Sequence, residues 1–128
     1  MNHQLKDASQ KLKKIKLPLE MEFVFEDNSE PYLIETANEQ PLKITLVSPF
    51  YVFKDGNGAL VDNPEVLSKI NVPEKIKIED ILITDLLVLQ LTCNGFTLLV
   101  MPGLYFGWGF YQNNKEILHY HGWDEGFE

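Results

Sequence analysis

Residues 1–16 carry apolar side chains every three or four positions, the spacing that gathers side chains on one face of an α-helix. The lysines of this segment lie off the apolar stripe, which consists of Leu5, Ala8, Leu12 and Ile15. We therefore predict an amphipathic helix over residues 1–16, ended by Pro18. Because the stripe is narrow, the helix should pack only lightly on the rest of the chain.

Residues 19–61 change to a period of two, which is typical of half-buried β-strands. In the first strand, apolar side chains alternate with Glu20 and Glu22, and Glu26 follows, so the outer face of this strand is acidic. The Ser48-Pro49 step confines its segment to a sheet edge or requires a bulge. The pattern predicts further strands over residues 32–36, 42–53 and 59–61.

A short helix is predicted over residues 64–70, because Asn63 is a good N-cap and Pro64 suits the first helical position. Residues 75–85 fit a strand or a helical turn, and the alternation of Ile76 and Ile78 favours the strand.

Residues 86–121 predict an antiparallel meander with a strong hairpin signal at Asn94-Gly95. No charged residue occurs between Leu86 and Asn114, but the glycines and Pro102 within this stretch favour strands and turns over a membrane-spanning helix. The expected strands are 86–92, 96–101, 104–111 and 116–121. The predicted fold class is α+β, mostly β: an antiparallel sheet with a C-terminal meander, an N-terminal amphipathic helix and one short internal helix.

The length of 128 residues and a hydrophobic content of 45% are sufficient for one domain over residues 1–128. Cys93 is the only cysteine, which excludes an intrachain disulfide framework and fits a reducing compartment. The N-terminal segment has no apolar run of the kind that a secretory signal contains. We expect a cytoplasmic protein.

Charge is distributed unevenly along the chain. Residues 1–16 hold five lysines and one aspartate, whereas residues 17–128 hold six lysines and eighteen acids, a balance of 6 − 18 = −12. The chain contains no arginine, a residue that grips phosphate with a planar fork. An acidic body of this kind repels nucleic acid and anionic membranes and attracts basic proteins. We therefore expect a basic protein partner, no nucleic acid and no membrane.

The segment 104–111 has two contrasting faces when it is read as a strand. One face is apolar, and the other consists of Tyr105, Gly107, Gly109 and Tyr111. Glycines in a strand mark a bend or the close approach of another chain or a ligand. The glycine face is either covered by a neighbouring element of the protein or open as a shallow groove for a partner.

His119 and His121 would share a face of the last strand, close to Asp124 and Glu125. Two imidazoles and a carboxylate can bind a metal ion, but no third protein ligand is identified, and surface histidines of structural origin fit equally well. Cys93 follows a row of leucines and reads as a small buried hydrophobe rather than a nucleophile. No serine lies in a nucleophile-elbow motif. We predict no enzyme activity, no catalytic residue and no cofactor.

The C-terminal tail combines aromatic and acidic residues, among them Trp123, Asp124 and Glu125, a mixture suited to a contact with a basic groove. In composition, though in no motif, the chain is similar to small acidic immunity proteins and antitoxins, which neutralise basic toxins such as nucleases. This similarity implies a bacterial inhibitor that blocks a basic cleft. The expected contact residues are Glu20, Glu22, Glu26, Tyr105, Tyr111, Trp123, Asp124 and Glu125.

Two other classes of function stay open. A ligand-binding or metal-binding domain, or an enzyme, would use a site near Tyr105 and Tyr111 with His119 and His121. A structural subunit of a larger assembly would use a sheet edge and the lysine-rich helix.

Overall fold

The computed structural model describes residues 3–104, 106–123 and 126–127. It contains two helices, α1 (His3–Leu12) and α2 (Pro64–Lys69). The strands are β1 (Leu19–Val24), β2 (Tyr32–Glu35), β3 (Leu42–Thr45), β4 (Phe50–Lys54), β5 (Asn57–Val61), β6 (Lys75–Ile83), β7 (Leu89–Cys93), β8 (Phe96–Val100), β9 (Gly109–Gln112) and β10 (Lys115–His119).

All ten strands belong to one sheet, in the order β10-β9-β3-β2-β1-β6-β7-β8-β4-β5. Each strand pairs antiparallel with its neighbours. The predicted fold class, α+β and mostly β with an antiparallel sheet, is confirmed.

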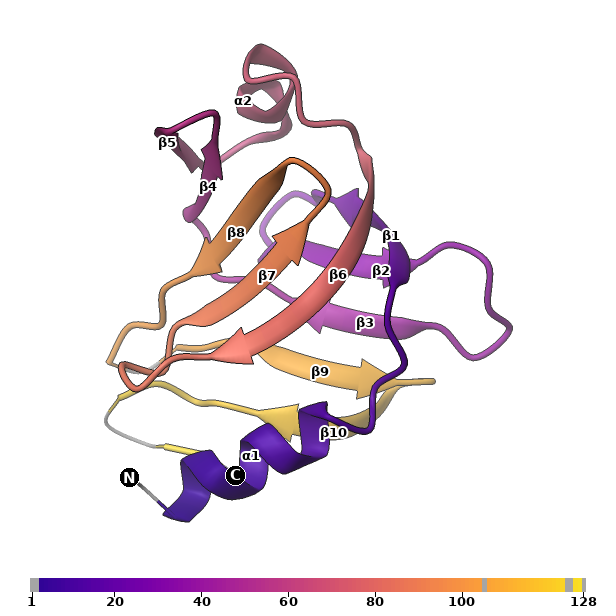
Figure 1. Cartoon of the computed structure of the whole chain (residues 1–128), viewed down its shortest axis with the longest axis vertical. Helices are drawn as coiled ribbons and strands as arrows, with labels where there is room; N and C mark the ends of the chain where they lie inside the picture. Colours follow the sequence, from indigo (N-terminus) through magenta and orange to yellow (C-terminus); the bar gives the residue numbers. More distant parts are fainter. Residues whose placement is uncertain (1–2, 105, 124–125, 128) are drawn as a thin grey trace.

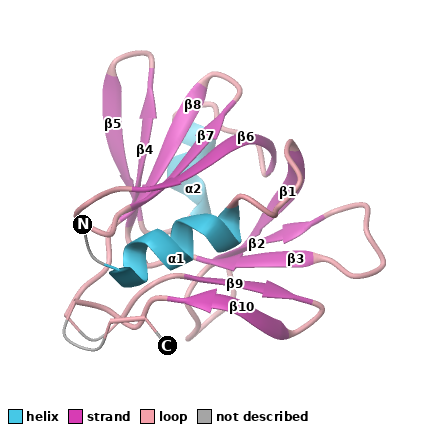
Figure 2. Cartoon of the chain, turned by 60° about the horizontal axis from the view of Figure 1, so that its bottom comes forward, coloured by secondary structure: helices cyan, strands magenta, loops and turns pink. Residues whose placement is uncertain are grey.

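The sheet is strongly curved around α1 (Figures 1 and 2). The helix contacts both β6 and β10, which are five strands apart in the sheet order. In a flat sheet these strands would lie about 24 Å apart, whereas a ten-residue helix is only about 15 Å long. One helix can touch both strands because the sheet bends around it.

Helix α1 buries the predicted stripe but is shorter than predicted. Leu5, Ala8 and Leu12 are buried, and Ile15 is half-buried beyond the helix end at Leu12. The narrow apolar stripe therefore anchors the helix in the curved sheet. Helix α2 lies at the opposite end of the molecule from α1 (Figure 1). Its N-cap is as predicted, since Asn63 Oδ1 accepts a hydrogen bond from the Glu65 amide at 3.0 Å.

Two predicted connections differ in the structure. The run 42–53 is divided around Ser48-Pro49 into β3 and β4, which lie in distant parts of the sheet, because a proline cannot donate to a central ladder. The last third forms two hairpins, β7–β8 and β9–β10, instead of a continuous meander. Strand β8 pairs with β4, and β9 pairs with β3. Residues 101–104 and 106–108 therefore belong to the connection between the two hairpins.

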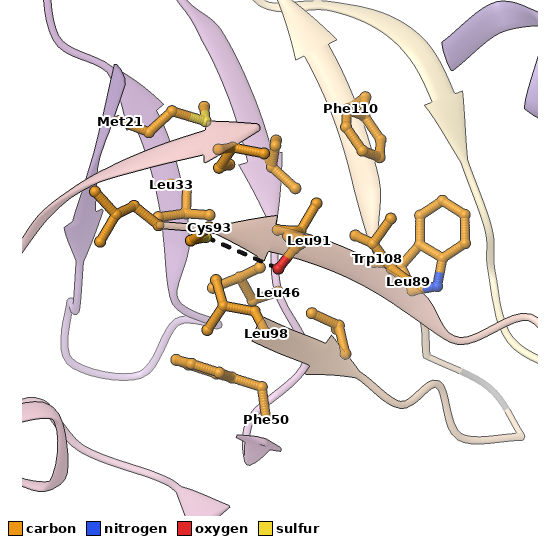
Figure 3. Close-up of a cluster of buried hydrophobic side chains, with 14 of the residues drawn as sticks. Met21, Leu33, Leu46, Phe50, Leu89, Leu91, Cys93, Leu98, Trp108 and Phe110 are labelled. Atoms are coloured by element: carbon orange, nitrogen blue, oxygen red, sulfur yellow. Dashed lines mark hydrogen bonds between the residues drawn. The ribbon is translucent and has the colours of Figure 1, made fainter. Parts of the chain in front are cut away.

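Figure 3 shows part of the hydrophobic core, a cluster of buried side chains that includes residues of β1, β2, β7, β8 and β9. Leu91 and Leu98 are cross-strand neighbours with no exposed surface, and Trp108 and Phe110 are also fully buried. Trp108 satisfies its indole N–H by donating to the Leu87 carbonyl at 3.1 Å. Within the described part of the chain, no buried residue is polar or charged. In the same part, no helix has the length and apolar character needed to span a membrane.

Candidate functional site

The acidic face predicted on β1 is balanced by lysines of the neighbouring strand. Glu20 lies directly opposite Lys77 on β6, and Glu22 lies directly opposite Lys75. Cross-strand pairs of opposite charge stabilise a sheet by about 0.2–1 kcal/mol relative to alanine pairs. The outer face of β1 therefore carries little net charge, because a lysine of β6 lies opposite each of these two glutamates.

A concentrated acidic surface lies beyond the end of β1, in a groove of about 280 Å³ between the β1–β2 turn and the β5–α2 connection. Three carboxylates line it, Glu26, Asp27 and Asp62, and no lysine or histidine is among the described residues that do so. Phe25, Pro31 and Pro64 give the groove apolar walls. We call this feature the acidic groove.

Packing of aromatic rings brings the two acidic segments together. The rings of Phe25 and Phe50 lie 6.4 Å apart and at 26° to one another, which joins the end of β1 to β4. Phe50 is the cross-strand neighbour of Val61 on β5, and Asp62 follows Val61. The core thus holds Asp62 beside a turn that is more than thirty residues earlier in the chain.

Hydrogen bonds fix the orientation of two carboxylates at this end of the molecule. Tyr32 Oη donates to Glu26 Oε1 at 2.6 Å, and the Ser48 amide donates to Glu30 Oε2 at 2.7 Å. The hydrogen bond to Glu26, together with burial and the charge of Glu26, raises the pKa of Tyr32. Lys43 Nζ lies 4.2 Å from the centre of the Tyr32 ring, a cation–π contact that also holds this tyrosine.

The two histidines form a stacked pair. The rings of His119 and His121 lie 4.3 Å apart and nearly parallel, at 12°. His119 Nδ1 is 2.7 Å from Tyr111 Oη and 3.7 Å from Glu116 Oε1. Among the residues that the structure describes, no three His, Cys, Asp or Glu side chains gather in a way that would hold a metal ion.

The predicted glycine face is filled by the chain itself. A Cβ on Gly107 would lie 1.8 Å from the Tyr120 carbonyl oxygen, and one on Gly109 would lie 2.9 Å from the Tyr111 ring. These glycines therefore permit close internal packing. Gly107 lies in the loop before β9 instead of the predicted strand, and Tyr105 lies outside the described residues.

Trp123 belongs to a group of exposed apolar side chains on three adjoining loops. Its indole N–H donates to the Leu86 carbonyl at 3.2 Å, and its amide donates to the Gly103 carbonyl at 2.9 Å. The group, here named the apolar loop surface, consists of Leu86, Leu104, Phe106 and Trp123, which are 74%, 57%, 56% and 49% exposed. Asp124 and Glu125 lie outside the described residues.

Reading 104–111 as one strand put Leu104 and Phe106 on the same apolar face as Trp108 and Phe110. In the structure Leu104 and Phe106 are exposed, whereas Trp108 and Phe110 are buried. Side chains alternate between the two faces of the sheet only from β9 onward. The segment before β9 is a loop that is hydrogen-bonded to Trp123, and without strand pairing its side chains need not alternate. Asp27 and Asp62 were also missed as a pair. The N-cap signal of Asn63, which follows Asp62, was readable, but the proximity of Asp62 to Asp27 depends on long-range packing.

Cys93 is buried, as predicted, with 5% of its surface exposed. Its Sγ lies 3.8 Å from the Leu91 carbonyl oxygen (Figure 3). Burial, assisted by the charge of Glu79, raises the pKa of the thiol to about 12. The thiol stays protonated at neutral pH, which is unsuited to nucleophilic catalysis.

The acidic groove and the apolar loop surface are thus two candidate sites for contact with another protein. Comparisons with known proteins add no further constraint. No protein-family model, no curated protein and no solved structure matches this chain.

Proposed function

We propose that this chain is an acidic protein-binding module that neutralises a basic partner. The turns that form the acidic groove would block the positively charged cleft of that partner. The observation that supports this proposal is the convergence of Glu26, Asp27 and Asp62 in one groove, with no lysine among the described residues that line it. Apolar walls beside oriented carboxylates provide both elements of a tight contact: anchors that exclude water and charges that steer the encounter.

The class of partner follows from the same charges. A cleft that binds nucleic acid is cationic, so a basic nuclease toxin is the natural target for a carboxylate-lined surface. The protein would then act as a cytoplasmic bacterial immunity protein or antitoxin. Glu20 and Glu22 contribute less to this contact than Glu26, because lysines lie opposite both of them.

A growth assay tests the inhibitory function. The gene next to this one in its own genome should encode a basic toxin domain, and expression of that domain alone should stop growth of a bacterial host. Co-expression of the wild-type chain should restore growth. The triple variant Glu26→Gln, Asp27→Asn, Asp62→Asn should fail to restore growth. The control, a double variant with Glu20→Gln and Glu22→Gln, should still restore it. Full rescue by the triple variant would contradict the proposal.

A second function, that of a structural subunit, is favoured by the apolar loop surface. Four large exposed side chains on adjoining loops are typical of a protein contact site. A contact of this kind would be insensitive to salt and would depend on Trp123 and Phe106, which separates it experimentally from a charge-steered inhibitor.

A further inference from the structure

A second groove, of about 520 Å³, lies beside the C-terminal part of α1. Helix α1 is at the end of the molecule opposite α2 (Figure 1). Its floor is aliphatic and consists of Ile15, Leu19, Leu42 and Ile117. Its rim carries Lys11, Lys14 and Lys16, three of the five lysines of the N-terminal segment. A volume of this size is within the usual range for small-molecule sites.

The charge of this groove is opposite to that of the chain as a whole. Glu35 is the only acid among the described lining residues, against three lysines, so the groove has a local balance of +3 − 1 = +2 on a chain of net charge −8. Glu35 Oε1 already accepts hydrogen bonds from the Leu42 amide at 2.9 Å and from Asn38 Nδ2 at 3.2 Å. Within the described residues, no ion pair engages any of the three lysines.

The lining chemistry defines the ligand. No aromatic ring is among the described lining residues, so the floor favours an aliphatic chain over a stacked ring. Lysines act as point charges and suit a compact anionic head group such as a carboxylate. We propose that this groove binds a small aliphatic anion, with its chain on the Leu19–Leu42 floor and its head group among Lys11, Lys14 and Lys16.

The proposal is independent of the acidic groove. The two features share no lining residue. A chain carrying Glu26→Gln, Asp27→Asn, Asp62→Asn should therefore bind the aliphatic anion as the wild type does, so failure of one proposal leaves the other standing.

Isothermal titration calorimetry with decanoate, kept below its micelle concentration, tests the site directly. Decanoate should bind with one-to-one stoichiometry and raise the melting temperature, whereas decanol and decyltrimethylammonium should bind at least about tenfold more weakly. Equal binding of the three probes would show that the groove binds apolar chains without recognising the anionic head group, and would overturn the proposal. Binding of phosphatidylglycerol vesicles without binding of free decanoate would also overturn it, since a membrane surface would then be the ligand.

Matched variants locate the head group. Replacing Lys11, Lys14 and Lys16 with glutamine should weaken decanoate binding by about tenfold. The control Lys13→Gln should leave it unchanged, because Lys13 faces a different groove, toward Asp80 and β6. Glu35→Gln keeps the acceptor oxygen for Leu42 but removes the opposing charge, so it should tighten binding. Unchanged affinity in the triple lysine variant would contradict the proposal. The melting temperature of the free variant checks that it is as stable as the wild type.

The floor is tested separately by Ile117→Trp. Ile117 is half-buried, so a larger side chain can extend into the groove without entering the core. Decanoate affinity should fall by at least about tenfold with an unchanged melting temperature of the free protein. Undiminished affinity would place the aliphatic chain elsewhere and overturn the assignment.

Discussion

Tyr32 and Glu26 are joined by a hydrogen bond of 2.6 Å from the phenol to Oε1, between the start of β2 and the turn that precedes it. The bond holds one of the three carboxylates of the acidic groove in place and raises the pKa of Tyr32. A local contact of two exposed segments thus orients a group that we assign to partner binding.

Spectrophotometric titration of the tyrosines tests this bond. Glu26→Gln should lower the pKa of Tyr32 toward its ordinary value near 10, because the hydrogen bond to Glu26, the largest cause of the shift, is weaker with a neutral amide oxygen, and the charge of Glu26 is removed as well. Titration of Tyr32→Phe identifies the Tyr32 signal by difference. An unchanged tyrosine titration in Glu26→Gln would contradict the assigned contact.

The same pKa shift sets a pH dependence of stability. A group whose pKa is raised by folding stabilises the native state fully below its unfolded pKa, and this contribution is lost as the pH rises through the folded pKa. The free energy of unfolding should therefore fall above about pH 10, and the fall should be smaller in Tyr32→Phe. Urea unfolding at pH 8 and at pH 11 measures the difference, and equal pH dependence of the two proteins would count against the bond.

Cys93 should be chemically inert in the folded protein. With a pKa of about 12, its thiolate fraction at pH 8 is about a thousandfold below that of a free cysteine, and burial adds a further barrier. Iodoacetamide should therefore modify the chain only in denaturant, as followed by mass spectrometry. Modification of the native protein at the rate of a free thiol would show that Cys93 is accessible.

Gly107 should tolerate no side chain. The Tyr120 carbonyl oxygen occupies the position next to its Cα, 1.8 Å from an added Cβ, and the backbone of both segments would have to move. We expect Gly107→Ala to lower the free energy of unfolding by about 3–5 kcal/mol. Gly56→Ala is the matched control: its site is open but has a φ of +81°, so about 1–2 kcal/mol is expected. Equal costs in urea unfolding would contradict the close approach.

Local signals in the sequence were sufficient for most elements of the fold. Asn63 and Pro64 mark the start of α2, and the alternation of Ile76 and Ile78 identifies β6, because capping and strand burial depend on neighbouring residues. The separation of β3 from β4 and of β8 from β9 depends instead on which distant strands pair. No periodicity within a segment carries that information.

The candidate site was predictable only in part. Glu26 was identified from the sequence, but the lysines opposite Glu20 and Glu22 became known only with the β1–β6 register. Asp62 joins Glu26 through the Phe25–Phe50 and Phe50–Val61 contacts, each of which links residues far apart in the chain. The site therefore depends on tertiary packing between segments that look unrelated in the sequence.

The central claim, that the acidic groove binds a basic partner, is tested most directly by affinity measurement with the toxin domain encoded beside this gene, in a catalytically inactive form. Surface plasmon resonance at low and high salt compares the wild type with the triple variant Glu26→Gln, Asp27→Asn, Asp62→Asn. The control is a second triple variant, Glu20→Gln, Glu22→Gln, Glu39→Gln, which has the same net charge as the first. The variant Trp123→Ala tests the apolar loop surface. We predict wild-type affinity for the control and for Trp123→Ala, a loss of at least about a hundredfold for the triple variant, and weakening of wild-type binding by salt. Full affinity of the triple variant, or binding that is independent of salt and lost in Trp123→Ala, would contradict the claim.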